Sequence, residues 1–239
     1  MPRILLLACI AVALAAADGP LKVVCFGDSI TGDRPRKPYL HQYLKWCDLV
    51  GLGLRARGAE VIMVNSGFGG DSSHGSPSGD PPGALNRLKA DVLDEHPAIC
   101  VVLIGGNDFA KVKGEAPDSP KVAEVTATLR VNLTSMVQQM KQAGIKVLLL
   151  QYHAARATDA AKAWKHLDWG NPVIAEVGRA AGVPVLALEP AFQAGLASGA
   201  TAEQLLNRVD GVHLNPRGEL VVAEAVIARI VELGWAGKP

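Results

Sequence analysis

Short runs of apolar and β-branched residues alternate along the chain with longer segments whose apolar positions recur every three or four residues. The short runs have the length and composition of buried strands, and the longer segments have the period of amphipathic helices. Such alternation is typical of βαβ units, in which helices cover a parallel sheet. Strands are predicted at 22–27, 60–64, 99–104, 145–150 and 183–188, with helices near 38–57, 83–95, 121–143, 172–181 and 216–234.

Five strands and five helices predict one three-layer α/β/α domain over residues 18–239. No internal repeat or linker interrupts it. Residues 51–56 (GLGLRA) superficially fit a dinucleotide-binding fingerprint, but they fall inside a predicted helix rather than after a strand. That position argues against a dinucleotide site, and we expect no cofactor.

Two of the connecting loops are long and rich in Gly, Pro, Ser and Asp. They cover residues 71–83 (DSSHGSPSGDPPG) and 109–120 (FAKVKGEAPDSP). Each comes after the carboxyl end of a predicted strand, which is the edge where open α/β sheets bind their ligands. We therefore expect these loops to flank a substrate site.

The first 17 residues have the three-part pattern of a secretory signal peptide. Arg3 precedes the apolar run 4–14, and the small residues 15–17 (AAA) follow it. This pattern predicts cleavage before Asp18 and a secreted or periplasmic protein. The alternative is a lipoprotein, because residues 6–8 (LLA) and Cys9 resemble a lipidation box, although only a short apolar run would precede that cysteine.

Composition excludes several classes of protein. The 239 residues are 49% hydrophobic and 20% charged, which suffices for one sizeable core and is not the composition of a disordered chain. The formal net charge of +1 shows no basic surplus of the kind that nucleic acid would require, so we do not expect nucleic acid as a partner. No stretch after the leader is long and apolar enough to span a bilayer. Three cysteines follow the leader, an odd number without zinc spacing, so we expect Cys25, Cys47 and Cys100 to be packing residues and no metal to be bound.

The turn after the first strand and a segment near the carboxyl terminus carry complementary chemistry. Ser29 follows Gly27-Asp28 at the end of a buried strand, a position that suits a nucleophile as well as an ordinary turn serine. Asp210 lies three residues before His213. This spacing can bring a carboxylate to Nδ1 of the imidazole while Nε2 points outward, which would supply a general base and the group that orients it.

The ends of the second and third strands offer hydrogen-bond donors. Asn107 lies in Gly105-Gly106-Asn107-Asp108, and residues 65–70 (NSGFGG) follow the second strand. An acyl-transfer enzyme needs donors aimed at a developing oxyanion, and an asparagine amide and a glycine N–H are suitable groups. With the strand order 2-1-3-4-5, the first and third strands flank the switch point, so Ser29 and Asn107 would meet there.

Four blocks of the sequence resemble those of the SGNH hydrolases, also called GDSL esterases and lipases. The resemblance implies a flavodoxin-like fold with Ser29 as nucleophile, His213 as base and Asp210 as its orienter. It also implies an oxyanion hole formed by the Ser29 N–H, the Gly70 N–H and the Asn107 side chain; Gly70 is chosen over its neighbouring glycines because it directly precedes Asp71-Ser72. The blocks are Gly27-Asp28-Ser29-Ile30, Gly70-Asp71-Ser72, Gly105-Gly106-Asn107-Asp108 and Asp210-Gly211-Val212-His213-Leu214.

The other common fold with a serine triad is disfavoured, because the chain contains no Gly-x-Ser-x-Gly elbow. We therefore predict a serine esterase that removes a short acyl group, such as acetyl, from an oxygen ester, perhaps on a carbohydrate. An acyltransferase or lipase-like enzyme of the same fold and a non-catalytic carbohydrate-binding protein are the alternatives. The segment 152–171, which contains His153, Trp164, His166 and Trp169, either lines the mouth of the site or packs internally.

Overall fold

The computed structural model describes residues 19–32, 44–76, 78–156 and 164–236. The predicted signal peptide 1–17, the alternative lipidation site at Cys9 and the beginning of the helix predicted at 38–57 lie outside these ranges.

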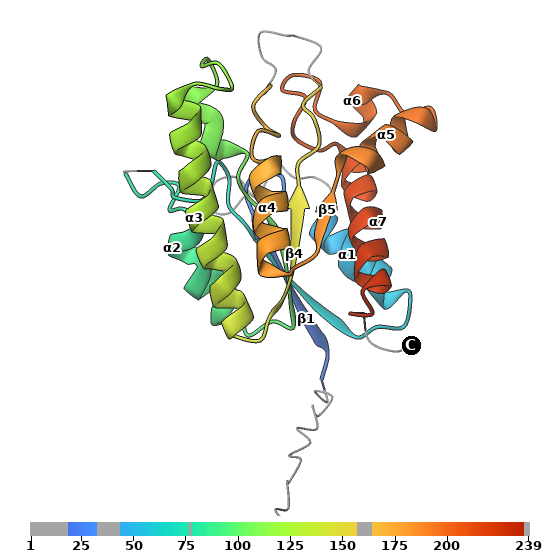
Figure 1. The fold of residues 1–239 in the computed structure, drawn as a ribbon. Coiled ribbons are helices and arrows are strands. Elements are labelled where there is room, and N and C mark those ends of the chain that lie inside the picture. Colours follow the sequence, from blue (N-terminus) through green and yellow to red (C-terminus); the bar gives the residue numbers. More distant parts are fainter. Residues whose placement is uncertain (1–18, 33–43, 77, 157–163, 237–239) are drawn as a thin grey trace, which may run out of the picture.

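A five-stranded parallel sheet with the order β2-β1-β3-β4-β5 forms the centre of the molecule (Figure 1). This is the order assumed from the sequence, and it places β1 between β2 and β3. Because both faces of the sheet are covered, β1 and β3 are almost continuously apolar. The strands are β1 (Leu21–Gly27), β2 (Val61–Gly67), β3 (Ile99–Leu103), β4 (Lys146–Gln151) and β5 (Val185–Ala187).

Helices cover both faces of the sheet and complete the predicted three layers. α3 and α4 lie side by side on one face, and α2 contacts α3; α1 and α7 pack together on the other side of the sheet (Figure 1). Their buried side chains join those of the strands in one hydrophobic core. The bounds are α1 (Trp46–Arg55), α2 (Ala84–Leu88), α3 (Pro120–Gln142), α4 (Asn171–Ala181) and α7 (Pro216–Glu232).

Several elements differ from the prediction. The helix expected at 83–95 is the short α2 followed by a π-helical turn, η1 (Lys89–Leu93), and the loop expected at 109–120 begins as a 3₁₀ helix, η2 (Asn107–Val112). The helices α5 (Glu189–Ala197) and α6 (Ala202–Leu205) were not predicted. Each has one buried residue, so neither presents the apolar stripe by which a helix is recognised.

Two predictions about composition can be checked within the described residues. Cys25, Cys47 and Cys100 are buried free thiols, as expected of packing residues. No helix in these ranges is both long and apolar enough to cross a membrane.

Candidate active site

A tight turn at the end of β1 presents Ser29. The backbone N–H groups of Thr31 and Gly32 both donate to the carbonyl oxygen of Asp28, at 3.1 and 3.0 Å. The Asp28 side chain also accepts from the Ile30 N–H at 2.9 Å. These bonds close the turn around Asp28, and they leave Ser29 half-buried at the carboxyl edge of the sheet.

The end of β2 supports this turn from the side. A Cβ on Gly67 would lie 2.0 Å from the Gly32 nitrogen, so only glycine allows the turn to lie against the strand. The Asn65 side chain completes the contact by donating from Nδ2 to the Thr31 carbonyl at 2.9 Å. The first two strands therefore determine together where Ser29 is placed.

The fold brings Ser29, His213 and Asp210 into one chain of hydrogen bonds. Ser29 Oγ lies 2.8 Å from His213 Nε2, and His213 Nδ1 lies 2.8 Å from Asp210 Oδ2. The other carboxylate oxygen of Asp210 accepts the backbone N–H groups of Val212 and His213 at 2.9 and 3.0 Å. Because a carboxylate only accepts, Nδ1 carries the ring proton, which leaves Nε2 to accept from the serine hydroxyl.

The charges in this chain adjust the pKa of the imidazole. Burial of His213 disfavours its protonated form, but the hydrogen bond and the negative charge of Asp210 outweigh burial and raise the pKa of His213 above its ordinary value. Burial of Asp210 acts to raise its pKa, yet the bonds from His213 and from the Val212 N–H hold the pKa of Asp210 below its usual range. The pair therefore combines an ionised carboxylate with a more basic imidazole, which suits proton transfer from a serine hydroxyl.

Gly70 follows β2 and Asn107 follows β3, the two strands on either side of β1, and the two residues lie beside each other. The Asn107 amide donates from Nδ2 to the Asp71 carbonyl at 2.8 Å, and its distance to Asp28 Oδ2 is 3.4 Å. Gly70 has a φ of +74°, which glycine adopts at no steric cost. Within the described parts of the chain, the N–H groups of Gly70 and Ser29 have no hydrogen-bond acceptor.

Asp28 is a buried carboxyl directly under the site. Burial raises the pKa of Asp28 to about 6, although the hydroxyl of Tyr152 and the Ile30 N–H both donate to it. The Tyr152 bond is 2.7 Å long and joins the end of β4 to the turn after β1. Sequence analysis gave Tyr152 no role, because a tyrosine after a strand has no local signal that identifies its partner.

A hollow of about 200 Å³ opens beside the two candidate donors. Besides Gly70 and Asn107, its lining includes Ser72, His74 and Lys111. Among the described residues that line it, none is a leucine, isoleucine, valine, phenylalanine, tyrosine or tryptophan. The loops 71–83 and 109–120 both contribute to this lining, as expected from their position.

The segment 152–171 packs internally where the structure describes it. His153 and His166 are buried, and the His153 ring stacks on Phe192 with the ring centres 4.4 Å apart. The Trp169 ring contacts the edge of Phe109, which is itself wholly buried. Packing therefore accounts for these aromatic residues.

Sequence analysis also missed a buried arginine. Arg87 lies on α2 with 7% of its surface exposed. A signal was present, because Arg87 shares one helical face with the buried Ala84 and Leu88. A charged residue on the apolar face of a predicted helix indicates a buried polar network.

No cluster of three or more His, Cys, Asp or Glu side chains within the described ranges is arranged to hold a metal ion.

Comparison with known proteins identifies the family. Residues 25–220 match the model of the GDSL-like lipase/acylhydrolase family. The chain belongs to this family. The matched residues include all four sequence blocks.

Two curated relatives of this GDSL-family chain differ in how much they cover. It is 35% identical to esterase TesA of Pseudomonas aeruginosa over 153 residues, which span 63% of the chain and 64% of TesA. The chain thus aligns with a little under two thirds of TesA. It is also 25% identical to the uncharacterized lipoprotein YqeF of Bacillus subtilis, over 85% of the chain and 87% of YqeF.

A solved structure confirms the fold of this family member. Axe2, an acetylxylan esterase from Geobacillus stearothermophilus, superimposes with a TM-score of 0.63 and 20% sequence identity. The match covers 88% of the chain and 94% of Axe2. At this identity the likeness concerns the fold alone.

Proposed function

We propose that the protein is an exported serine esterase that removes short acyl groups, acetyl foremost, from oxygen esters, including esters on carbohydrates. The observation that carries the proposal is the continuous hydrogen-bond chain from Ser29 through His213 to Asp210, with 2.8 Å at each of its two junctions. The family match supports it, as do an esterase among the curated relatives and an acetylxylan esterase among the structural neighbours. The proposed mechanism needs no cofactor.

The proposed reaction proceeds through an acyl-enzyme. Ser29 Oγ attacks the ester carbonyl carbon while His213 Nε2 takes the hydroxyl proton, and Asp210 stabilises the resulting imidazolium. When the tetrahedral intermediate collapses, the bond from carbon to the leaving oxygen breaks and His213 returns the proton to the departing alcohol. Water then adds to the acyl-enzyme with His213 again as base, and carboxylic acid and free Ser29 are released.

Three donors are proposed to stabilise the oxyanion. The N–H groups of Ser29 and Gly70 lack an acceptor within the described chain, so neither has to give up a bond. The Asn107 amide has one proton committed to Asp71, and the other is directed only weakly at Asp28, because 3.4 Å is longer than an ordinary N–H···O bond. We assign that second proton to the oxyanion.

The hollow beside these donors favours a small acyl group. Each methylene of a long chain that stays in water forgoes about 0.8 kcal/mol of burial. The hollow measures about 200 Å³, and among its described lining residues no large apolar side chain supplies the continuous groove that a long chain needs. A lipase-like preference for long chains is therefore disfavoured.

Export is proposed from the leader pattern of residues 1–17, which leaves a mature chain starting at Asp18. YqeF is described as a lipoprotein, which supports an extracytoplasmic setting and keeps lipidation at Cys9 as the alternative. No partner beyond the ester substrate is proposed.

An acyl-length series tests the function. We expect kcat/KM to fall from p-nitrophenyl acetate through butyrate to octanoate, and Ser29→Ala to lose at least roughly 10⁴-fold on acetate while remaining folded. Circular dichroism supplies the control for folding. Acetylated oligosaccharides then test the carbohydrate substrate.

Each of the other outcomes supports a different function. Rates that rise steadily towards octanoate would indicate a lipase-like enzyme. Preferential transfer of the acetyl group to an added alcohol would indicate an acyltransferase. Binding of oligosaccharide without any hydrolysis that depends on Ser29 would indicate a non-catalytic binding protein.

A further inference from the structure

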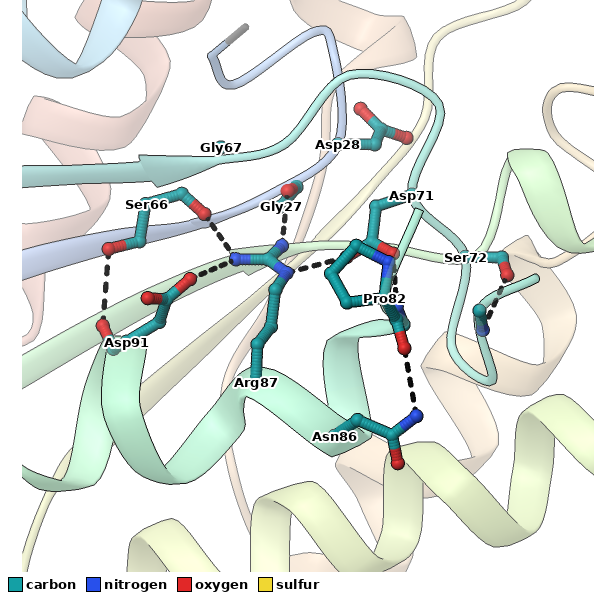
Figure 2. A network of polar contacts seen from close by, with 12 residues as sticks. Gly27, Asp28, Ser66, Gly67, Asp71, Ser72, Pro82, Asn86, Arg87 and Asp91 are labelled. Atoms are coloured by element: carbon teal, nitrogen blue, oxygen red, sulfur yellow. Dashed lines mark hydrogen bonds and ion pairs between the residues drawn. The ribbon is translucent and has the colours of Figure 1, made fainter. Parts of the chain in front are cut away.

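Arg87 lies at the centre of a buried network of polar contacts (Figure 2). Its guanidinium group extends from α2 to the ends of β1 and β2 and to the loop that follows β2. Nη2 donates to the Gly27 carbonyl at 2.6 Å and Nη1 to the Ser66 carbonyl at 2.7 Å. Nε donates to Asp71 Oδ2 at 2.6 Å, and Nη1 also reaches Asp91 Oδ2 at 2.8 Å.

Two of these acceptors belong to the strands that support the nucleophile. Gly27 is the last residue of β1 and lies two positions before Ser29, while Ser66 lies next to the end of β2. The Gly27 carbonyl also accepts the Phe68 N–H at 2.9 Å, so Arg87 binds its second acceptor site, and Ser66 lies on β2, an edge strand of the sheet. Arg87 therefore links the ends of β1 and β2 at the point where the turn that carries Ser29 begins.

The third acceptor belongs to the candidate oxyanion loop. Asp71 directly follows Gly70, and its backbone carbonyl accepts the Asn107 amide at 2.8 Å. The Asp71 side chain is fully buried, and it accepts from Arg87 on one oxygen and from the Gly83 N–H on the other, at 2.9 Å. The position of Asp71 thus sets the positions of two candidate donors, and Arg87 holds Asp71.

The cluster is suited to arginine rather than to lysine. A guanidinium group has five donors in a planar fork, and here they serve two carbonyls and two carboxylates at once, whereas lysine offers three donors at one point. The plane also packs over the Phe26 ring, 4.1 Å from its centre, where an aromatic face attracts a cation. Lysine at this position would keep a positive charge near Asp71, but it could not donate to all four acceptors at once.

We propose that Arg87 is a positioning residue for ester hydrolysis, which aligns the Ser29 turn with the oxyanion donors Gly70 and Asn107. It touches no reacting atom and acts through Gly27, Ser66 and Asp71. Since oxyanion donors stabilise the transition state more than the bound ester, a small displacement lowers kcat and changes KM little. This inference rests on the proposed esterase function.

The test compares Arg87→Lys with the control Arg130→Lys. Arg130 on α3 forms a half-exposed ion pair with Glu176 on α4, so the control makes the same substitution outside the buried network. Both variants and the parent are assayed with p-nitrophenyl acetate, with kcat expressed per active site by titration with an organophosphate that labels the serine. We expect Arg87→Lys to lose about 10²-fold in kcat with KM within roughly threefold, and Arg130→Lys to stay within about twofold of the parent in both. Thermal melts establish that each variant is folded.

A second variant covers the case in which Arg87→Lys does not fold. The double substitution Arg87→Met with Asp71→Asn removes both members of the fully buried ion pair, and the carboxylate that remains in the cluster, Asp91, is partly exposed to solvent. We expect this protein to fold and to show the same loss in kcat. A folded variant of either kind with the parental kcat, or with a change in KM alone, would overturn the positioning role.

The parent and Ser29→Ala in the same assay separate this inference from the function on which it rests. A parent without hydrolysis that depends on Ser29 would refute the esterase itself and the role of Arg87 with it. An active parent combined with an equally active, folded Arg87→Lys would refute the role of Arg87 alone.

Discussion

The ring of His153 donates from Nε2 to the carbonyl oxygen of Val212 at 3.0 Å, in the middle of the segment that joins Asp210 to His213. A carbonyl only accepts, so the proton lies on Nε2, and the buried Nδ1 has no partner among the described residues. Burial lowers the pKa of His153 to about 4, which keeps the ring neutral near pH 7. The Arg156 N–H donates to the adjacent Gly211 carbonyl at 2.8 Å, so the chain after β4 holds the His213 segment at two successive carbonyls.

Removing this bond should disturb His213, the proposed base. His153→Leu keeps an apolar filling against Phe192 but leaves the buried Val212 carbonyl unpaired, which costs about 1–3 kcal/mol of stability. We expect kcat to fall by roughly 10-fold because His213 loses its support, and His153→Gln, whose amide can donate, to recover part of that loss. Urea unfolding and steady-state kinetics measure the two effects. Equal activity of the leucine and glutamine variants would contradict a role for the hydrogen bond.

The oxyanion assignment predicts a specific kinetic effect at Asn107. Asn107→Ala should lower kcat by roughly 10²–10³-fold and change KM much less, since the donor bonds mainly in the transition state. Steady-state kinetics on p-nitrophenyl acetate measure both constants. A rise in KM with an unchanged kcat would make Asn107 a substrate-binding or loop-shaping residue instead.

The dependence of the rate on pH reports the His213–Asp210 pair. In the proposed mechanism His213 accepts the Ser29 proton only when its ring is neutral, so kcat/KM should rise with pH through the pKa of the imidazole. Because the pKa of His213 is raised in the fold, this limb should lie above the ordinary value of 6.5. Asp210→Asn removes the negative charge that raises the pKa, so the limb should shift to lower pH while the plateau falls.

A profile of kcat/KM from about pH 5 to 9 measures this shift. Glu176→Gln serves as the control, since Glu176 pairs with Arg130 at the surface and its substitution should leave the limb in place. An Asp210→Asn limb that coincides with the parental one would show that Asp210 does not set the basicity of His213.

The periodicity of the sequence was sufficient to predict the sheet and its main helices. The buried strands β1 and β3 are almost continuously apolar, and α3 and α7 have the apolar stripe that marks a helix against a core. Local spacing was also enough to propose the pairing of Asp210 with His213, because three residues on one turn place the carboxylate beside the ring. In these cases the interaction lies within a few residues of chain.

Only the tertiary structure decided which distant groups meet. Arg87 lies 60 residues from Gly27, and His153 lies 59 residues from Val212. The sequence does not indicate which side chain will donate to a given backbone carbonyl, because every residue has such a carbonyl and different folds would bring different arginines or histidines to it. Such distant pairs form only when the helices and loops pack on the sheet. The place of Ser29 after the first strand could therefore be predicted from the sequence, but the residues that hold it in place could not.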